Sequence, residues 1–237
     1  RVKEGLFRQV PDACLVDPPF VGDLVSPGDT VVLVVPIDLG APKGRLILPQ
    51  VHALRDLLDH DALALIVKES ELAAALERLN TPPRLVVCDS QVVQRVAAET
   101  PAEIRMTTFS ILMARIKGDM LGLAAGAGAL SRLKPGDRVL IAEACTHAPV
   151  GEDIGRVKIP AMLRKRIGPA LRVNVVAGTD FPADLTPYDL VIHCGACMFN
   201  RRHVLSRVAQ ARAQHVPMTN YGVAIAYLQG ILDKIEY

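Results

Sequence analysis

The sequence lacks several features that would assign it to common classes of protein. Its longest apolar stretch, residues 120–130, is rich in Gly and Ala and falls short of the ~18 uncharged residues that a membrane-spanning helix needs. The 27 basic and 25 acidic residues nearly cancel, so the strongly basic character typical of a nucleic-acid-binding protein is absent. The first ten residues are charged and contain no apolar core, so they do not read as a secretory signal peptide. We therefore expect a cytoplasmic protein that binds neither membranes nor nucleic acid.

Motifs of self-contained enzymes are missing as well. No GxxxxGK[ST] phosphate-binding loop occurs, no GxGxxG joins a predicted strand to a helix, and neither GxSxG nor HExxH is present. The five cysteines are an odd number in a chain without a signal peptide, which argues against a disulfide framework. Nothing in these patterns indicates a self-contained hydrolase or dehydrogenase.

Half of the residues are hydrophobic, and short β-branched runs alternate with stretches of helical periodicity. This alternation predicts βαβ units with parallel strands. The run at residues 31–35 (VVLVV) is continuously apolar, as expected of a strand buried on both faces. The expected strands are residues 31–35, 62–67, 84–88, 104–107, 138–144, 172–176, 189–193 and 216–219, and the expected helices are residues 46–58, 70–79 with Ser70 as N-cap, 91–99, 109–117, 158–167, 201–214 and 222–235.

These elements form two sets that open with the same phrase. Pro-Gly-Asp, which favours a turn into a buried strand, occurs at residues 27–29 and again at residues 135–137. The predicted fold class is α/β, with two consecutive domains, each a mainly parallel β-sheet flanked by helices in a flavodoxin- or Rossmann-like three-layer arrangement. We place the boundary near Gly118, ahead of the glycine-rich residues 122–128, which we expect to be flexible.

Three of the cysteines follow predicted strands. Cys145 begins the motif Cys-Thr-His147 at the end of one strand, and His193-Cys194-Gly-Ala-Cys197 ends another. Because the carboxyl ends of parallel strands meet at one edge of an open sheet, we expect these thiols and imidazoles to converge. The CxxC pair can hold one metal centre from a single turn, and the helix that follows favours an anionic group.

Three thiolates are one short of a four-cysteine iron–sulfur site, so a fourth iron would need a His, a carboxylate, water or an exchangeable guest. Glu152 lies seven residues beyond Cys145 and could reach it, although it could equally form the acidic first turn of the next helix. His193 is a weaker candidate, because neighbours on a strand point to opposite faces. A structural Cys₃His zinc site and a redox-active cysteine pair also remain open. Cys14 and Cys88 receive no role, and Cys88 is expected to be a small buried hydrophobe.

At this constellation the sequence resembles the HydF family, the scaffold maturases of FeFe-hydrogenase. The resemblance rests on CxH…HCxxC together with four further segments, which extend it from about residue 20 to the C-terminus. The segments are VPID at residues 35–38, APKGRLILPQ at 41–50, DIGRVKIP at 153–160 and TNYGVAIAY at 219–227.

The resemblance implies a division of the chain and a function. Residues 1–117 would be a linker and dimerisation domain, and residues 118–237 an iron–sulfur cluster-binding domain. The family's N-terminal GTPase domain has no counterpart here, so we expect no enzymatic activity of this chain. Cys145, Cys194 and Cys197 would hold a 4Fe-4S cluster whose fourth iron has an exchangeable ligand and accepts a diiron subcluster precursor carrying CO and cyanide.

The same resemblance implies partners for the chain. It would form a homodimer through its first domain, for example by pairing sheet edges, and would bind apo FeFe-hydrogenase and the other maturases. For the fourth iron ligand we favour Glu152, then His147, then His193, because a hard carboxylate leaves an iron readily. The alternatives are a redox or lyase-type enzyme that uses the cluster, and a structural zinc protein.

Overall fold

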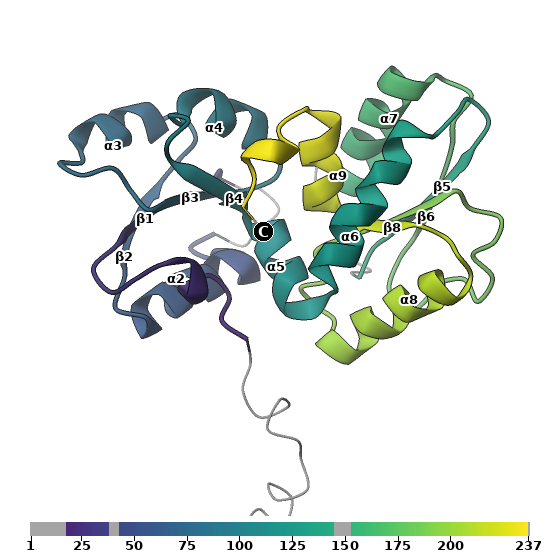
Figure 1. Ribbon diagram of the computed structural model, residues 1–237, viewed down its shortest axis with the longest axis horizontal. Helices are drawn as coiled ribbons and strands as arrows, with labels where there is room; N and C mark the ends of the chain where they lie inside the picture. Colours follow the sequence, from purple (N-terminus) through teal and green to yellow (C-terminus); the bar gives the residue numbers. More distant parts are fainter. Residues whose placement is uncertain (1–17, 38–42, 145–152, 237) are drawn as a thin grey trace, which may run out of the picture.

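A computed structural model describes residues 18–37, 43–144 and 153–236. Two four-stranded parallel sheets follow one another along the chain, each flanked by helices, and they lie on opposite sides of the molecule (Figure 1). The predicted fold class is confirmed. The strands are β1 (Thr30–Val34), β2 (Leu63–Val67), β3 (Leu85–Cys88), β4 (Arg105–Thr108), β5 (Arg138–Ala142), β6 (Arg172–Val176), β7 (Leu190–His193) and β8 (Met218–Asn220).

The α-helices are α2 (Leu48–Asp59), α3 (Leu72–Arg78), α4 (Val93–Glu99), α5 (Phe109–Lys117), α6 (Met120–Ala127), α7 (Ile159–Ile167), α8 (Arg201–Ala213) and α9 (Tyr221–Leu228). Short helical turns are η2 (Gly22–Leu24), η3 (Gly128–Ser131), η4 (Ile154–Lys158) and η5 (Leu232–Lys234). None of the helices in these described ranges is long and apolar enough to cross a membrane.

Both sheets have the same strand order. The first unit is ordered β2-β1-β3-β4 and the second β6-β5-β7-β8, with every pairing parallel. The Pro-Gly-Asp phrase introduces the second strand in each order, and the glycine of each phrase has a positive φ, 85° at Gly28 and 100° at Gly136. Glycine adopts this left-handed conformation without a steric penalty, so the same turn starts each sheet.

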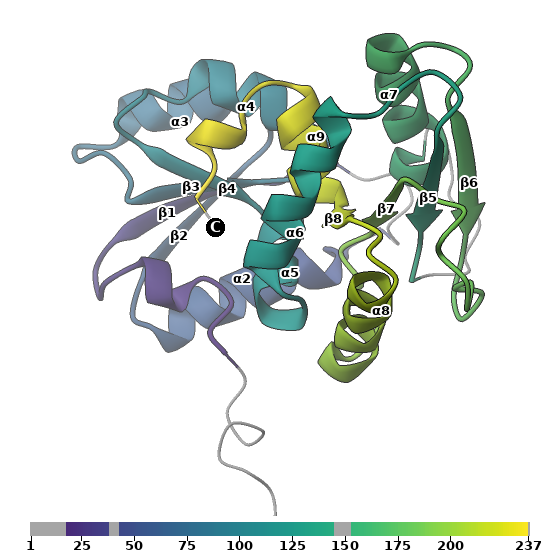
Figure 2. The ribbon, with the colours of Figure 1, turned by 45° about the vertical axis from the view of Figure 1, so that its right-hand side comes forward.

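The strands alternate between two cores because successive side chains point to opposite faces. Val31 and Leu33 pack with α2 and α5, whereas Val32 and Val34 pack on the other face. This second core continues into the other sheet, where Val139 and Ile141 contribute, and α9 contributes Val223, Ala224 and Ile225 to it. Helices α5, α6 and α9 lie between the two sheets (Figure 2). One shared core therefore fixes the two units against each other.

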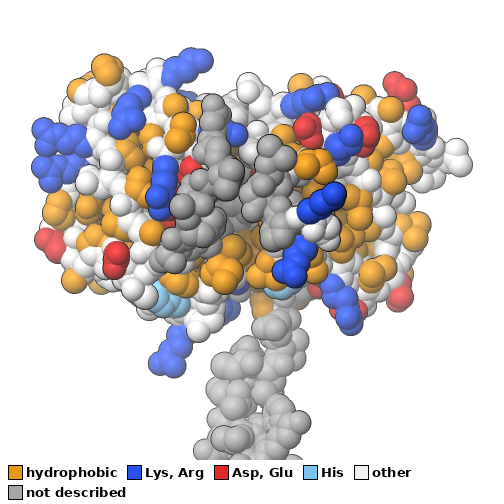
Figure 3. Space-filling view, turned by 180° about the vertical axis from the view of Figure 1, so that it is seen from behind, with side chains coloured by type: hydrophobic (Ala, Val, Ile, Leu, Met, Phe, Trp, Pro, Cys, Tyr) orange, Lys and Arg blue, Asp and Glu red, His pale blue; other side chains and the backbone are white. Residues whose placement is uncertain are grey.

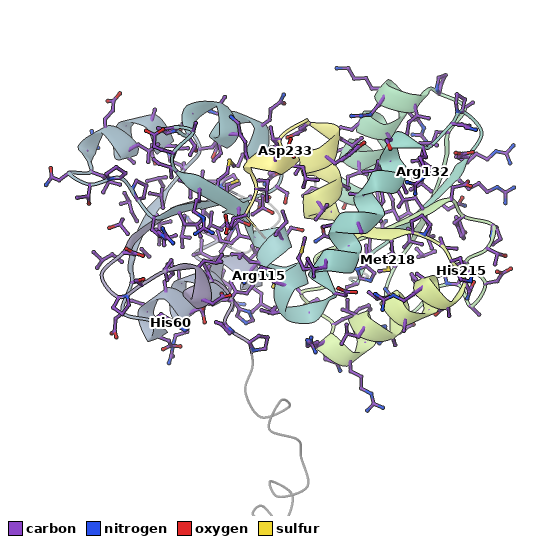
Figure 4. The ribbon with its side chains drawn as sticks, in the orientation of Figure 1. His60, Arg115, Arg132, His215, Met218 and Asp233 are labelled. Atoms are coloured by element: carbon purple, nitrogen blue, oxygen red, sulfur yellow. The ribbon has the colours of Figure 1, made fainter. Side chains whose placement is uncertain are left out.

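Three details differ from the sequence-based expectations. Residues 122–128 are not a flexible segment but belong mostly to α6, whose Gly126 approaches the Met218 carbonyl so closely that a Cβ would overlap it. Met218 lies beside this helix (Figure 4). Helix α9 ends at Leu228 rather than near residue 235, and Gly230 follows with φ of 70°. Helix α3 begins at Leu72 after Glu71, so Ser70 is not its N-cap.

The residues after α9 cover one edge of the first sheet. Ile235 forms a parallel bridge with Met106 on β4, and the Glu236 N–H donates to the Met106 carbonyl at 2.8 Å. The Glu236 carboxylate also forms an ion pair with Arg105. Strand β2, at the opposite end of this sheet, has no neighbour on its outer side among the described strands.

Candidate metal centre

The predicted ligands divide into two groups. Cys194 and Cys197 follow β7 and are free thiols in the described part of the chain. Cys145, His147 and Glu152 lie outside the described residues, so their roles stay predictions. Among the residues that are described, no three His, Cys, Asp or Glu side chains come together in a way that could hold a metal.

Cys194 lies where two adjacent strands end. Strands β5 and β7 pair with Ala142 opposite His193, so the chain leaves both strands at the same edge of the sheet. The Cys194 Sγ accepts hydrogen bonds from the Ala144 N–H at 3.0 Å and the Ala196 N–H at 3.4 Å. Ala144 immediately precedes Cys145 in the sequence. The CxxC turn therefore lies against the residue that leads into the third predicted cysteine.

The protonation state of Cys194 follows from its surroundings. Burial raises the pKa of its thiol to about 11, an effect that the two N–H donors oppose and that the nearby Cys197 and Glu143 reinforce. In the metal-free protein the thiol is therefore protonated at neutral pH. Binding of a metal would release this proton, because thiolate is the ligating form. The N–H donors stabilise that thiolate once it forms.

The CxxC turn is tight and partly exposed. Ala196 has a φ of 54°, an uncommon conformation for a residue other than glycine. Cys197 is half-buried and Met198 is 70% exposed. The turn ends at Asn200, whose side chain caps α8 by accepting from the His203 N–H at 2.9 Å. Both cysteines are therefore partly buried, and the turn reaches the surface at Met198.

A lysine from the first unit binds the same turn. The Lys117 ammonium, at the end of α5, donates to the carbonyls of Ala196 at 2.9 Å, Cys197 at 2.9 Å and Phe199 at 2.6 Å. Burial lowers the pKa of Lys117, and the two nearby cysteines oppose that shift. This residue is absent from the sequence-based list of candidates, because no local motif marks a contact made across two units.

His193 has other partners for both of its ring nitrogens. Its Nδ1 lies 2.8 Å from the Cys194 carbonyl and its Nε2 lies 2.9 Å from Arg207 Nη1. Because a guanidinium only donates, Nε2 accepts and Nδ1 carries the proton. Burial lowers the pKa of His193 to about 4, the bond to the Cys194 carbonyl raises it, and the Arg207 charge lowers it further. The neutral imidazole thus supports the backbone of the CxxC turn.

Arg207 is 3% exposed and completes this support. It donates to the Gly178 carbonyl at 2.5 Å and lies between the rings of Phe181 and Phe199, with centroids at 4.6 and 4.7 Å. Two aromatic faces stabilise a buried guanidinium that has no carboxylate partner among the described residues. Sequence analysis did not single out this arginine, which reads as one basic position in an amphipathic helix.

Glu143 and Tyr221 form a further group of residues close to Cys194. The Glu143 carboxylate, just after β5, accepts from Arg156 Nη2 at 2.9 Å and Nε at 3.1 Å. Burial, followed by the proximity of Cys194 and Glu143, raises the pKa of the Tyr221 hydroxyl far above its usual value. That hydroxyl has no hydrogen-bond partner among the residues the structure describes. A Cβ on Gly155 would overlap the Tyr221 hydroxyl, so the glycine of the DIGRVKIP segment allows the tyrosine to approach this closely.

The described residues fit an iron–sulfur cluster in their chemistry. Two free cysteines occupy one turn at the carboxyl edge of a parallel sheet, and N–H groups already donate to the Cys194 sulfur. Hydrogen bonds to the sulfur atoms and partial burial are the means by which proteins tune such clusters.

The fold and this arrangement define a protein of two consecutive α/β units that brings a cysteine pair to the boundary between them. Comparison with protein families identifies both units. The model of the hydrogen maturase F dimerization domain matches residues 20–118, and that of the hydrogen maturase F tetramerization domain matches residues 121–236. No curated protein matched the chain.

The chain therefore belongs to the hydrogen maturase F (HydF) family. Membership supports a scaffold role in hydrogenase maturation, since the two matched domains are scaffold domains rather than catalytic ones. The presence of a dimerization and a tetramerization domain also supports self-association.

Proposed function

We propose that the chain holds a 4Fe-4S cluster through Cys145, Cys194 and Cys197 and carries a diiron precursor for transfer to apo FeFe-hydrogenase. The observation that carries this proposal is the pair of hydrogen bonds to Cys194 Sγ, from Ala144 and Ala196. They link the CxxC turn to the residue before Cys145, which supports a site shared by the two strand ends. Within the HydF family, residues 1–117 would serve dimerisation and residues 118–237 would serve cluster binding, and residues 121–236 also match a tetramerization domain.

The protein's own groups would perform three tasks. The thiolates of Cys194 and Cys197 would bind iron, while the Ala144 and Ala196 N–H groups offset the negative charge on the Cys194 sulfur. His193 and Arg207 would hold the turn in place without binding iron. When bound, the cluster supplies an iron with an exchangeable ligand, to which the cyanide-bearing precursor, as cargo, can attach.

The test is anaerobic analysis of iron, sulfide and zinc, with EPR of the reduced protein before and after addition of cyanide or imidazole. We expect about four irons per chain and a spectrum that shifts with the added ligand. Cys197→Ala should lose most of the iron, whereas Cys88→Ala should keep it, because Cys88 is fully buried beside the Thr107 carbonyl in the first sheet. One zinc per chain with no EPR signal after reconstitution would mean a closed structural site and would refute the proposal.

The fourth ligand is tested in the same preparation. We expect Glu152→Ala to retain the cluster and change its EPR spectrum, because removal of the carboxylate leaves the fourth iron to water or another donor. An unchanged spectrum in that variant, combined with a changed one in His147→Ala, would reverse the order of the two candidates.

For self-association we propose antiparallel pairing of β2 with β2 of a second copy. On the opposite end of this sheet, the residues around Glu236 already cover β4. On β2 the side chains of Leu63 and Ile66 are 60% and 48% exposed, and neighbouring Leu58 of α2 is 65% exposed. Apolar side chains lie among charged ones on the surface of the first unit, at the right in Figure 3. An apolar strand with a free edge is prone to pair with another chain.

A further inference from the structure

Helix α5 of the first unit presents one face to the CxxC turn of the second. Ser110, Met113 and Lys117 are spaced three and four residues apart, so they share that face. A Cβ built on Gly195 would lie 3.7 Å from Ser110 Oγ and 3.8 Å from Met113 Cβ. Met113 and Lys117 also line a small cavity together with Cys194. The first unit therefore supplies the side chains that pack against the CxxC turn.

Lys117 is the charged residue on this face of α5. An ammonium has three N–H donors, and Lys117 has a carbonyl of the turn within hydrogen-bond distance for each of them. The three acceptors come from residues 196–199, which include Cys197 and the left-handed Ala196. The Lys117 ammonium therefore binds three carbonyl groups of the tight turn at once.

The same position gives Lys117 an electrostatic effect on a bound cluster. A 4Fe-4S core with three thiolates carries net negative charge, and one-electron reduction makes it more negative. A nearby cation, partly shielded from water, stabilises the reduced form more than the oxidised form. The cation therefore raises the reduction potential and favours retention of an anionic, cyanide-bearing cargo.

We infer that Lys117 is a positioning residue of the cluster site, supplied by the dimerization unit, which fixes the CxxC turn and sets the potential of the cluster bound there. The inference rests on the proposed function. It also links assembly to chemistry, because a displacement of α5 relative to the second unit would move the carbonyls of the turn and the charge beside the cluster together.

The test compares reconstituted wild type with Lys117→Met, with Lys134→Met as the matched control. Lys134 is exposed and lies at the turn before β5, at the opposite edge of the sheet from the cysteines. EPR-monitored redox titration should show a more negative midpoint potential for Lys117→Met and an unchanged one for Lys134→Met. Amide hydrogen exchange of residues 195–199 in the metal-free protein should be faster in Lys117→Met alone.

The outcomes separate this inference from the proposed function. Equal midpoint potentials in wild type and Lys117→Met, both loaded with cluster, would overturn the role of Lys117 and leave the cluster intact. Failure of wild type and Lys134→Met to load any cluster would instead overturn the proposed function. If Lys117→Met does not fold, Lys117→Gln carries the test, because it keeps a donor and removes the charge. Its potential must also be more negative than that of wild type.

Discussion

Acidification should destabilise the metal-free protein through His193. This side chain is 2% exposed and its pKa is lowered from 6.5 to about 4, mainly by burial. The unfolded chain therefore binds the proton more tightly than the folded one. The sign follows from linkage: the stability associated with neutral His193 is complete above about pH 6.5 and is lost as the pH falls from there toward 4.

The size of the effect follows from the two pKa values. At pH 5 the imidazole is almost fully protonated in the unfolded chain and about one-tenth protonated in the folded one. Integration of the linkage relation gives a loss of about 2 kcal/mol between pH 7 and pH 5 from this residue alone. The loss stops growing below about pH 4, where both states are protonated.

Urea denaturation at pH 7 and pH 5 measures this loss, and a substitution isolates it. His193→Asn should lower stability at both pH values, because Asn cannot reach both partners of the imidazole, but should remove about 2 kcal/mol of the pH dependence. His215→Asn is the control: His215 is exposed at the end of α8, with φ of 57°, which Asn tolerates (Figure 4). If wild type and His193→Asn lose the same free energy between pH 7 and pH 5, the assignment of His193 as a buried neutral group is wrong.

Three further predictions address the fold and the assembly. Ile66→Lys should convert the dimer to monomers in light scattering, whereas Leu121→Lys, at an exposed site of the second unit, should leave the dimer intact. If the Ile66→Lys protein is still a dimer, β2 is not the dimer interface. Arg207→Met should lower the free energy of unfolding in urea by about 3 kcal/mol, because His193 Nε2 and the Gly178 carbonyl lose their donors; a loss under about 1 kcal/mol would contradict this account. Gly126→Ala should cost about 1–3 kcal/mol in the same assay through overlap with β8. Gly128→Ala, where the nearest atom to a new Cβ is 4.0 Å away, should be neutral or slightly stabilising, and equal effects at the two glycines would refute the packing argument.

Sequence patterns located the central strands well because these strands are buried on both faces, and they also located the more exposed edge strand β6. The run at residues 31–35 became β1 with a shift of one residue, and residues 172–176 became β6 without any shift. Cys88 is fully buried, as expected of a small hydrophobe. Continuous apolar runs bounded by Pro-Gly turns have few alternatives to a central parallel strand.

Helix α6 and the end of α9 were missed for a physical reason. Glycines within residues 122–128 suggest flexibility by intrinsic preference, yet Gly126 is needed where the helix backbone approaches β8. Tertiary packing overrides the weak propensity of such a segment. Likewise, the apolar character of residues 229–235 reflects contact with the first sheet rather than continuation of a helix.

The candidate site was only partly accessible from sequence. Spacing alone indicated that the CxxC pair follows a strand, and alternation along that strand ranked His193 last among the candidate ligands. The supports of the turn, Lys117 and Arg207, come from other helices and carry no local motif. Lys117 and Cys197 are 80 positions apart in the sequence, so their contact can be recognised only once the fold is known.

The repeated strand order makes the two halves of the chain internal counterparts of one another. In the register of each sheet, Val34 pairs with Cys88 as Ala142 pairs with His193, so Asp89 is the topological equivalent of Cys194. The same strand terminus thus ends in a carboxylate in one half and in a thiol in the other. One shared architecture therefore carries two different features, an exposed apolar strand edge in the first unit and a cysteine-bearing strand end in the second.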